Sequence, residues 1–238
     1  MYRQVSLEES RVKYTKFNLP ILLLSYAFLV ACAQVKDILG LPGAKVVLSN
    51  QAKTFVYECP DGYSFTVSLD GGQAWLFLPE QTIQLPHVSS GSGAKFSKKQ
   101  ITFWSKGNEA RLESGSKVHV ACKNNQAKAV WEHAKLNGVD FRALGNEPSW
   151  VLEIVNGNTI IFSDFYDKIN FYVFKKPEPE VDQSTSTTIF KVKNESHVIS
   201  VSIFGTTCQD TMSGELFESS VIVELDGKSF KGCGKALH

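Results

Sequence analysis

The sequence lacks the motifs of several familiar enzyme classes. It contains neither Gly-x-Ser-x-Gly, which exposes a serine nucleophile, nor His-Glu-x-x-His, which holds a catalytic zinc ion. No Cys-x-x-Cys pair is present either, so the five cysteines make a poor zinc site. A peptidoglycan hydrolase would need a nucleophile with a base, or a pair of carboxylates, and the spacing of residues in the sequence reveals neither. We therefore predict that the protein is not an enzyme and carries no metal or cofactor.

An excess of charge of one sign is also missing. The chain has 25 Lys and Arg residues against 24 Asp and Glu residues, with a net charge of +1. A protein that binds nucleic acid or anionic lipid through its charge has a clear basic excess. The balance therefore predicts no nucleic-acid partner. Apolar residues make up 43% of the chain and aromatic residues 11%, which is ample for packed cores.

The apolar run near the start is too short to span a membrane. It covers Leu19 to Val30, about 12 residues, whereas a spanning helix needs roughly 20. The run follows a basic segment and ends at Leu29-Val30-Ala31-Cys32, which is the organisation of a secretory signal. We predict a signal peptide over residues 1–31 and export from the cytoplasm.

The end of this signal resembles the lipobox of bacterial lipoproteins, in which the cysteine takes a diacylglycerol. The resemblance implies that Cys32 is lipidated, which would anchor the chain to a membrane through its new N-terminus. Ala33 follows the cysteine, where lipoproteins retained at the inner membrane tend to have Asp, so the implied location is the outer membrane, facing the periplasm. The alternative is an ordinary signal cut near Ala31 or Ala33, with a free thiol left over.

Short alternating runs with turn residues between them fill the chain from Lys53 onward. This spacing predicts antiparallel barrels or sandwiches, an all-β fold class. Residues 126–136 have the one good helical pattern, and Gly138 ends it. Lys176 to Thr187 is polar and contains two prolines, which predicts a loop. We predict a tether over 32–52, a first β domain over 53–123, a bridging helix within 124–138 and a second antiparallel β domain over 139–238.

Export also explains the other four cysteines. An even number of cysteines is expected in an oxidising compartment, and four remain: Cys59, Cys122, Cys208 and Cys233. They allow three pairings. We predict Cys59–Cys122 and Cys208–Cys233, because each bond then stays within one domain.

Four aromatic residues of the first domain lie in its alternating runs. They are Tyr57, Trp75, Phe103 and Trp104. Aromatic residues at such positions belong to a core more often than to a ligand platform. We expect all four to fill the first domain, which disfavours a ligand pocket inside it.

The first domain resembles the MliC/PliC family, the membrane-bound and periplasmic inhibitors of c-type lysozyme. The resemblance covers about residues 55–122. It rests on Tyr57-x-Cys59, Gly62, Ser90-Gly91-Ser92-Gly93-Ala94, Phe103-Trp104-x-Lys106-Gly107, Glu109-Ala110, Leu112 and Cys122. It implies an antiparallel β-barrel of about eight strands.

The resemblance also implies a mechanism and a partner, c-type lysozyme. In the family, a serine of the glycine-rich loop and a lysine of the following hairpin enter the lysozyme cleft, and they correspond here to Ser92 and Lys106. Ser90, Gly91 and Gly93 complete the loop. The sequence departs from the family at Phe96, where a tyrosine is usual, and this puts the affinity in doubt if the missing hydroxyl bonds the enzyme.

The second half resembles an uncharacterised family of bacterial envelope lipoprotein domains. The resemblance rests on Gly145-Asn146-Glu147-Pro148-x-Trp150 and Cys208-x-Asp210-x-Met212-Ser213-Gly214. Glu147 and Asp210 would form a binding site if the fold brings them together, whereas the simpler reading makes them turn and surface residues.

We therefore predict an envelope lipoprotein that inhibits c-type lysozyme and so protects peptidoglycan. The alternative from another class is a periplasmic ligand-binding or envelope-scaffold lipoprotein without inhibitor activity. The oligomeric state does not follow from the sequence.

Overall fold

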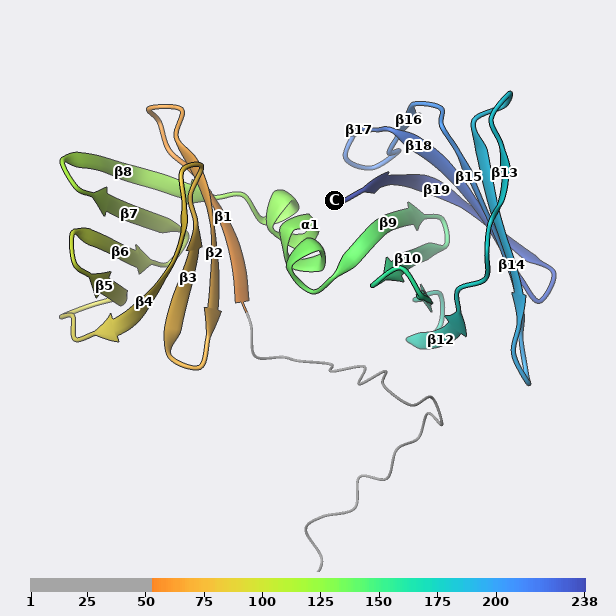
Figure 1. Cartoon of the computed structure of the whole chain (residues 1–238), viewed down its shortest axis with the longest axis horizontal. Helices are drawn as coiled ribbons and strands as arrows, with labels where there is room; N and C mark the ends of the chain where they lie inside the picture. Colours follow the sequence, from red (N-terminus) through yellow and green to blue (C-terminus); the bar gives the residue numbers. More distant parts are fainter. Residues whose placement is uncertain (1–52) are drawn as a thin grey trace, which may run out of the picture. The chain divides into compact units, whose positions relative to one another are not determined.

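The structure, a computed structural model, describes residues 53–238 (Figure 1). The predicted signal peptide (1–31), the lipidation site at Cys32 and the tether (32–52) lie outside the described residues. Within 53–238, no helix has the length and apolar character to cross a membrane.

The first part of the chain forms a closed antiparallel barrel of eight strands in sequential order. The strands are β1 (Lys53–Glu58), β2 (Ser64–Asp70), β3 (Gln73–Phe77), β4 (Thr82–Val88), β5 (Ala94–Lys98), β6 (Ile101–Lys106), β7 (Glu109–Ser114) and β8 (Lys117–Asn124). Pairing of Tyr57 with Asn124 and of Glu58 with Lys123 joins β1 to β8 and closes the barrel. The predicted barrel is confirmed.

Alternation along the strands decides which aromatic residues fill the barrel. Tyr57 and Phe103 are 1% and 0% exposed, as predicted. The prediction was wrong for Trp75 and Trp104, which are 40% and 38% exposed. Because successive side chains of a strand point to opposite faces, inward Phe103 forces Trp104 outward, and Trp75 points outward between buried neighbours.

The single helix of the described chain is α1 (Gln126–Leu136), at the predicted residues. The Asn125 side chain caps it by accepting from the Lys128 N–H at 3.1 Å. Its Trp131 packs with Phe217 and Cys233 of the second half of the chain. The Lys128 ammonium contacts the Glu58 carboxylate of β1 at 2.5 Å.

The chain then forms one curled antiparallel sheet of nine strands and a small hairpin, so the predicted second β fold is confirmed. The sheet order is β12 (Asn170–Lys175), β11 (Thr159–Asp164), β10 (Ser149–Val155), β9 (Val139–Asn146), β19 (Lys228–Ala236), β18 (Ser219–Leu225), β15 (Val198–Phe204), β14 (Thr187–Lys193) and β13 (Glu180–Asp182). The hairpin pairs β16 (Cys208–Gln209) with β17 (Leu216–Phe217).

One segment of this sheet differs from the prediction. The range Lys176 to Thr187 was predicted as a loop, but β13 lies inside it. All three residues of β13 are exposed, and the strand forms by pairing with β14 at the edge of the sheet. Because the strand forms by backbone pairing and buries no apolar side chain, its sequence has no alternation of apolar and polar residues that would predict it.

The cysteine prediction is confirmed in both halves. Cys59 is bonded to Cys122 in the barrel, and Cys208 to Cys233 in the second sheet. The second bond ties the β16–β17 hairpin to β19.

The turn inside this hairpin is organised by the carboxylate of Asp210, which is only 6% exposed. Its Oδ1 accepts from the N–H groups of Met212 and Ser213 and from the Ser213 hydroxyl, at 3.1, 2.6 and 2.8 Å. Its Oδ2 accepts from Asn146 Nδ2 at 2.7 Å. The backbone N–H of Ser213 is the main cause that lowers the pKa of Asp210 below its ordinary value of 3.8.

We predict that Asp210→Asn lowers the free energy of unfolding by about 2 kcal/mol at pH 7, because hydrogen bonds to a charged carboxylate are lost. Since the folded-state pKa is depressed, this contribution is present above pH 3.8 and disappears as the pH falls through the folded-state pKa. Denaturant unfolding of wild type and variant between pH 7 and pH 2 measures the difference.

The matched control is Asp167→Asn, which changes an exposed carboxylate of the same half of the chain. A difference for Asp210→Asn that stays constant down to pH 2 would contradict the assigned role of the ionised carboxylate.

Candidate functional site

The glycine-rich loop of residues 89–93 joins β4 to β5 and is held in shape by its own side chains. The Ser90 hydroxyl donates to the carbonyl oxygens of Ser92 and Gly93, at 3.1 and 3.0 Å. Trp104 Nε1–H of strand β6 donates to the same Ser92 oxygen at 2.8 Å. The loop is therefore tied both to itself and to the barrel wall.

Gly93 brings this loop against the end of β6. Its φ is +69°, a region that disfavours residues with a side chain. A Cβ on Gly93 would lie 2.2 Å from the Ser105 carbonyl oxygen and 3.2 Å from Lys106 Cβ. No other residue type fits without displacing backbone, so the end of the loop lies against the strand that carries Lys106.

Lys106 ends β6 at a two-residue turn to β7. Lys106 pairs with Glu109 across the hairpin, and Gly107 has a φ of +60° at the first turn position, as tight two-residue hairpin turns favour. The Lys106 side chain is exposed and belongs to none of the ion pairs among the described residues. Its ammonium is therefore free to meet an external anion.

Ser92 has a similarly free functional group. The residue is exposed, and its carbonyl oxygen is already bonded from two sides. Its hydroxyl has no hydrogen bond within residues 53–238. The site thus offers a hydroxyl that can donate or accept and an ammonium without an ion pair among residues 53–238, groups suited to carboxyl groups in different protonation states.

Two further loop predictions can be placed. Gly91 has open space around its Cα and no positive φ, so nothing in the fold requires glycine there. Phe96 is 5% exposed and packs with Phe103 in the barrel core, and the edge of its ring contacts the exposed His87. The position of Phe96 favours a packing role for the ring, so we expect little effect from the missing hydroxyl.

A row of alternating charge runs from this hairpin around the barrel. In register across the strands it contains Lys106, Glu109, Lys123 and Glu58. The Lys128 ammonium at Glu58 ends the row on α1. Positive and negative residues alternate along this row, and Lys106 lies at its end.

A second polar cluster lies at the other end of the barrel, since consecutive antiparallel strands alternate in direction. The His119 Nδ1–H donates to Asp61 Oδ2 at 2.6 Å, and its ring stacks on Tyr63 with centroids 3.9 Å apart. This bond is the main cause that lowers the pKa of Asp61. Burial, with a hydrogen bond to Glu80, raises the pKa of Tyr63 to about 12. The groups satisfy one another and close the barrel end.

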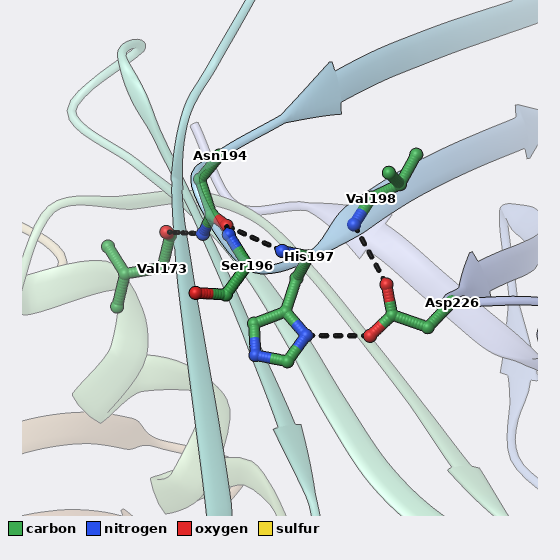
Figure 2. Close-up of polar contacts among 6 residues, drawn as sticks. All are labelled: Val173, Asn194, Ser196, His197, Val198 and Asp226. Carbon is green, nitrogen blue, oxygen red and sulfur yellow. Dashed lines mark hydrogen bonds and ion pairs between the residues drawn. The ribbon is translucent and has the colours of Figure 1, made fainter.

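Figure 2 shows a third polar cluster, in the second sheet, where His197 is hydrogen-bonded to Asp226. Asp226 accepts from the Val198 N–H at 2.9 Å and from His197 Nδ1–H at 2.6 Å, and these bonds lower its pKa, the backbone bond most. Asn194 caps the same turn and donates to the Val173 carbonyl. The Ser196 hydroxyl has no bond to the imidazole among the described residues, so the cluster joins turns and has no activated nucleophile.

The second sheet also has a cavity of about 460 Å³. Asn146, Glu147 and Asp210 all line it, so the fold does bring the two predicted residues to one place. The Asp210 carboxylate accepts four hydrogen bonds, three from its own turn and one from Asn146, which favours a structural role. Glu147 is exposed at the rim.

Within residues 53–238, no group of three or more His, Cys, Asp or Glu side chains lies close enough together to hold a metal ion.

The residue that sequence reasoning missed is Trp104, which we expected in the core. The signal that could have found it is the alternation beside Phe103, which places the indole on the outer face of the same strand as Lys106.

Comparisons with known proteins found similarity to the barrel part of the chain. Residues 57–121 match the family model described as membrane-bound lysozyme-inhibitor of c-type lysozyme. The membrane-bound lysozyme inhibitor of C-type lysozyme from Yersinia enterocolitica is 40% identical over 83 residues, which is 34% of this chain and 69% of the relative.

A solved structure is also similar, that of Pseudomonas aeruginosa MliC in complex with hen egg white lysozyme. Its sequence is 30% identical, and the match covers 39% of this chain and 98% of that chain, with a TM-score of 0.26. From the family match and the Yersinia relative, the chain belongs to the family of membrane-bound lysozyme inhibitors of c-type lysozyme.

Proposed function

We propose that this protein inhibits c-type lysozyme by presenting the loop of residues 89–93 together with Lys106 to the active-site cleft. The observation that supports the proposal is the close approach of Gly93 to Ser105 and Lys106, which brings the backbone of the loop against the end of β6 that carries Lys106. The relative with which it shares 40% identity is named as an inhibitor of this enzyme class.

The chemistry of the target fits these two groups. Lysozyme acts through one carboxyl group that stays protonated because its pKa is raised, and one that is ionised. The Ser92 hydroxyl can bond either form, and the Lys106 ammonium can pair with the ionised one. Ser90 and Gly93 shape the loop, and Gly91 allows the backbone to approach the cleft wall.

The interior of the barrel disfavours the ligand-binding alternative. Phe65, Phe103, Leu76 and Leu112 are each at most 2% exposed and pack in one cluster. A barrel filled in this way has its binding groups on its loops, which agrees with a role as a plug.

We propose that the rest of the chain brings this barrel to the envelope. Residues 1–31 would direct export, Cys32 would carry lipid, and residues 32–52 would tether the barrel domain of residues 53–123. Residues 124–138 would bridge to the second domain, 139–238. The name of the Yersinia relative, a membrane-bound inhibitor, supports a membrane location. Ala33 after the cysteine favours the outer membrane, with the domains facing the periplasm.

We predict that Ser92→Ala and Lys106→Ala each weaken inhibition, by about tenfold, because each removes a partner of a buried carboxyl group. The loss for Lys106→Ala should be larger at low salt than at high salt, since an ionic contact is screened. The loss for Ser92→Ala should depend little on salt. Inhibition constants in a cell-wall lysis assay at two ionic strengths measure both effects.

The matched controls are Ser116→Ala and Lys117→Ala, which change exposed residues at the turn between β7 and β8, at the opposite end of the strands. Melting temperatures of all four variants should stay close to wild type, because the altered side chains are exposed. Full inhibition by the Ser92→Ala/Lys106→Ala double variant would refute the proposed site.

We predict that Gly91→Ala leaves the melting temperature unchanged but weakens inhibition several-fold. The added methyl group meets nothing in the free protein and needs no positive φ, whereas a cleft wall at van der Waals distance would clash with it. Thermal unfolding and inhibition are measured on the same sample. Unchanged inhibition would show that the enzyme does not approach this face of the loop.

A further inference from the structure

Trp104 is an exposed tryptophan whose polar group is turned to the candidate site. Its indole N–H donates to the Ser92 carbonyl oxygen at 2.8 Å, although the two residues are 12 apart in the chain. This oxygen also accepts from the Ser90 hydroxyl at 3.1 Å. The peptide group that follows the Ser92 side chain is thus held by two donors, of which only the indole comes from the barrel wall.

The indole itself is held in place by its neighbours on the outer face of the barrel. Trp104 pairs with Lys95 of β5 on one side and with Arg111 of β7 on the other. The Lys95 ammonium lies 5.7 Å from the centre of the ring, within the range of a cation–π contact. Arg111 is in turn bonded to Glu113 at 2.8 Å. A ring held by the Lys95 contact and flanked by Arg111 in the neighbouring strand can fix the loop through a single hydrogen bond.

The alternative reading is that Trp104 only covers the barrel, as Trp75 does. Trp75 is also on the outer face, and the two side chains are almost equally exposed, at 40% and 38%. The Trp75 indole, however, makes no hydrogen bond within the described residues. The difference between the two tryptophans is therefore the bond to Ser92, and not burial.

We propose that Trp104 is a positioning residue that pre-organises the loop of residues 89–93 for binding. The inference rests on the proposed function, because the partner that the loop meets is the lysozyme cleft. With the Ser92 carbonyl fixed to the barrel, the Ser92 hydroxyl keeps its position relative to the barrel wall before the partner arrives. A loop without this bond populates other conformations, and the apparent affinity falls by the fraction that remains competent.

The test compares Trp104→Phe with its matched control Trp75→Phe, in the chain from residue 32 onward with Cys32→Ser. Phenylalanine keeps an aromatic ring on the outer face and removes the N–H donor. Three quantities are measured: the inhibition constant against a c-type lysozyme, the melting temperature, and the NMR order parameters of the backbone N–H groups of residues 91–93 in the free protein.

We expect Trp104→Phe to weaken inhibition about fivefold, as for the loss of one hydrogen bond. The order parameters of the loop should fall in this variant, while its melting temperature stays equal to that of Trp75→Phe. Trp75→Phe should match wild type in both inhibition and loop order.

Three outcomes would overturn the inference. Unchanged loop order in Trp104→Phe would exclude positioning, including the case in which inhibition falls through a lost direct contact. Unchanged inhibition with a looser loop would show that binding does not use the pre-organised form. An equal loss of inhibition in Trp75→Phe would indicate a general effect on the barrel.

Failure of the proposed function is distinguishable from failure of this inference. If the wild-type chain inhibits no c-type lysozyme, the proposed function fails, and with it the role of Trp104 in binding. The order parameters of the free protein still report whether the indole holds the loop. If wild type inhibits, the two variants decide the role of Trp104 alone.

Discussion

The close approach of Gly93 to the end of β6 is the contact on which the candidate site depends. Pairing of Ala94 with Ser105 sets the register of β5 and β6, and one residue further the loop backbone lies against Ser105 where a side chain would not fit. This contact brings the loop that carries Ser92 against the strand end that carries Lys106, although 13 residues separate the two in the sequence. Barrel closure holds this register, and a slip by one residue would turn Lys106 inward.

Much of this arrangement was predictable, because a period of two is a strong signal. Alternating runs between Lys53 and Asn124 indicated the strands, and a helical pattern over residues 126–136 indicated α1. The same alternation places Trp104 outside once Phe103 is inside, but a general preference of aromatic residues for cores led to the opposite expectation. The indole bond to Ser92 was beyond prediction, since it depends on where the loop backbone runs.

The second half of the chain shows a different limit of sequence reasoning. The domain division was enough to predict the Cys208–Cys233 pairing, because it confined each bond to one half. It was not enough to tell whether Asp210 binds a ligand or shapes a turn, since both roles use a carboxylate near glycine and serine. The hydrogen bonds separate these roles: three donors reach Asp210 from its own turn and one from Asn146. Exposed β13 forms by backbone pairing alone, and side-chain patterns do not report on that.

The same criterion, whether a polar group is already bonded within the fold, separates candidate binding residues from structural ones among residues 53–238. Asp210, Asp226 and Asp61 accept hydrogen bonds from their own surroundings, so their charge serves the fold. The Ser92 hydroxyl and the Lys106 ammonium have no such partner in the described residues, and nothing inside the barrel calls for glycine at Gly91. Ser92 and Gly91 are on a loop whose backbone is bonded to Ser90 and Trp104, and Lys106 ends the strand against which this loop lies. Such a combination is what a protein needs to bind a rigid cleft at low entropic cost, because the ordering is complete before the partner arrives.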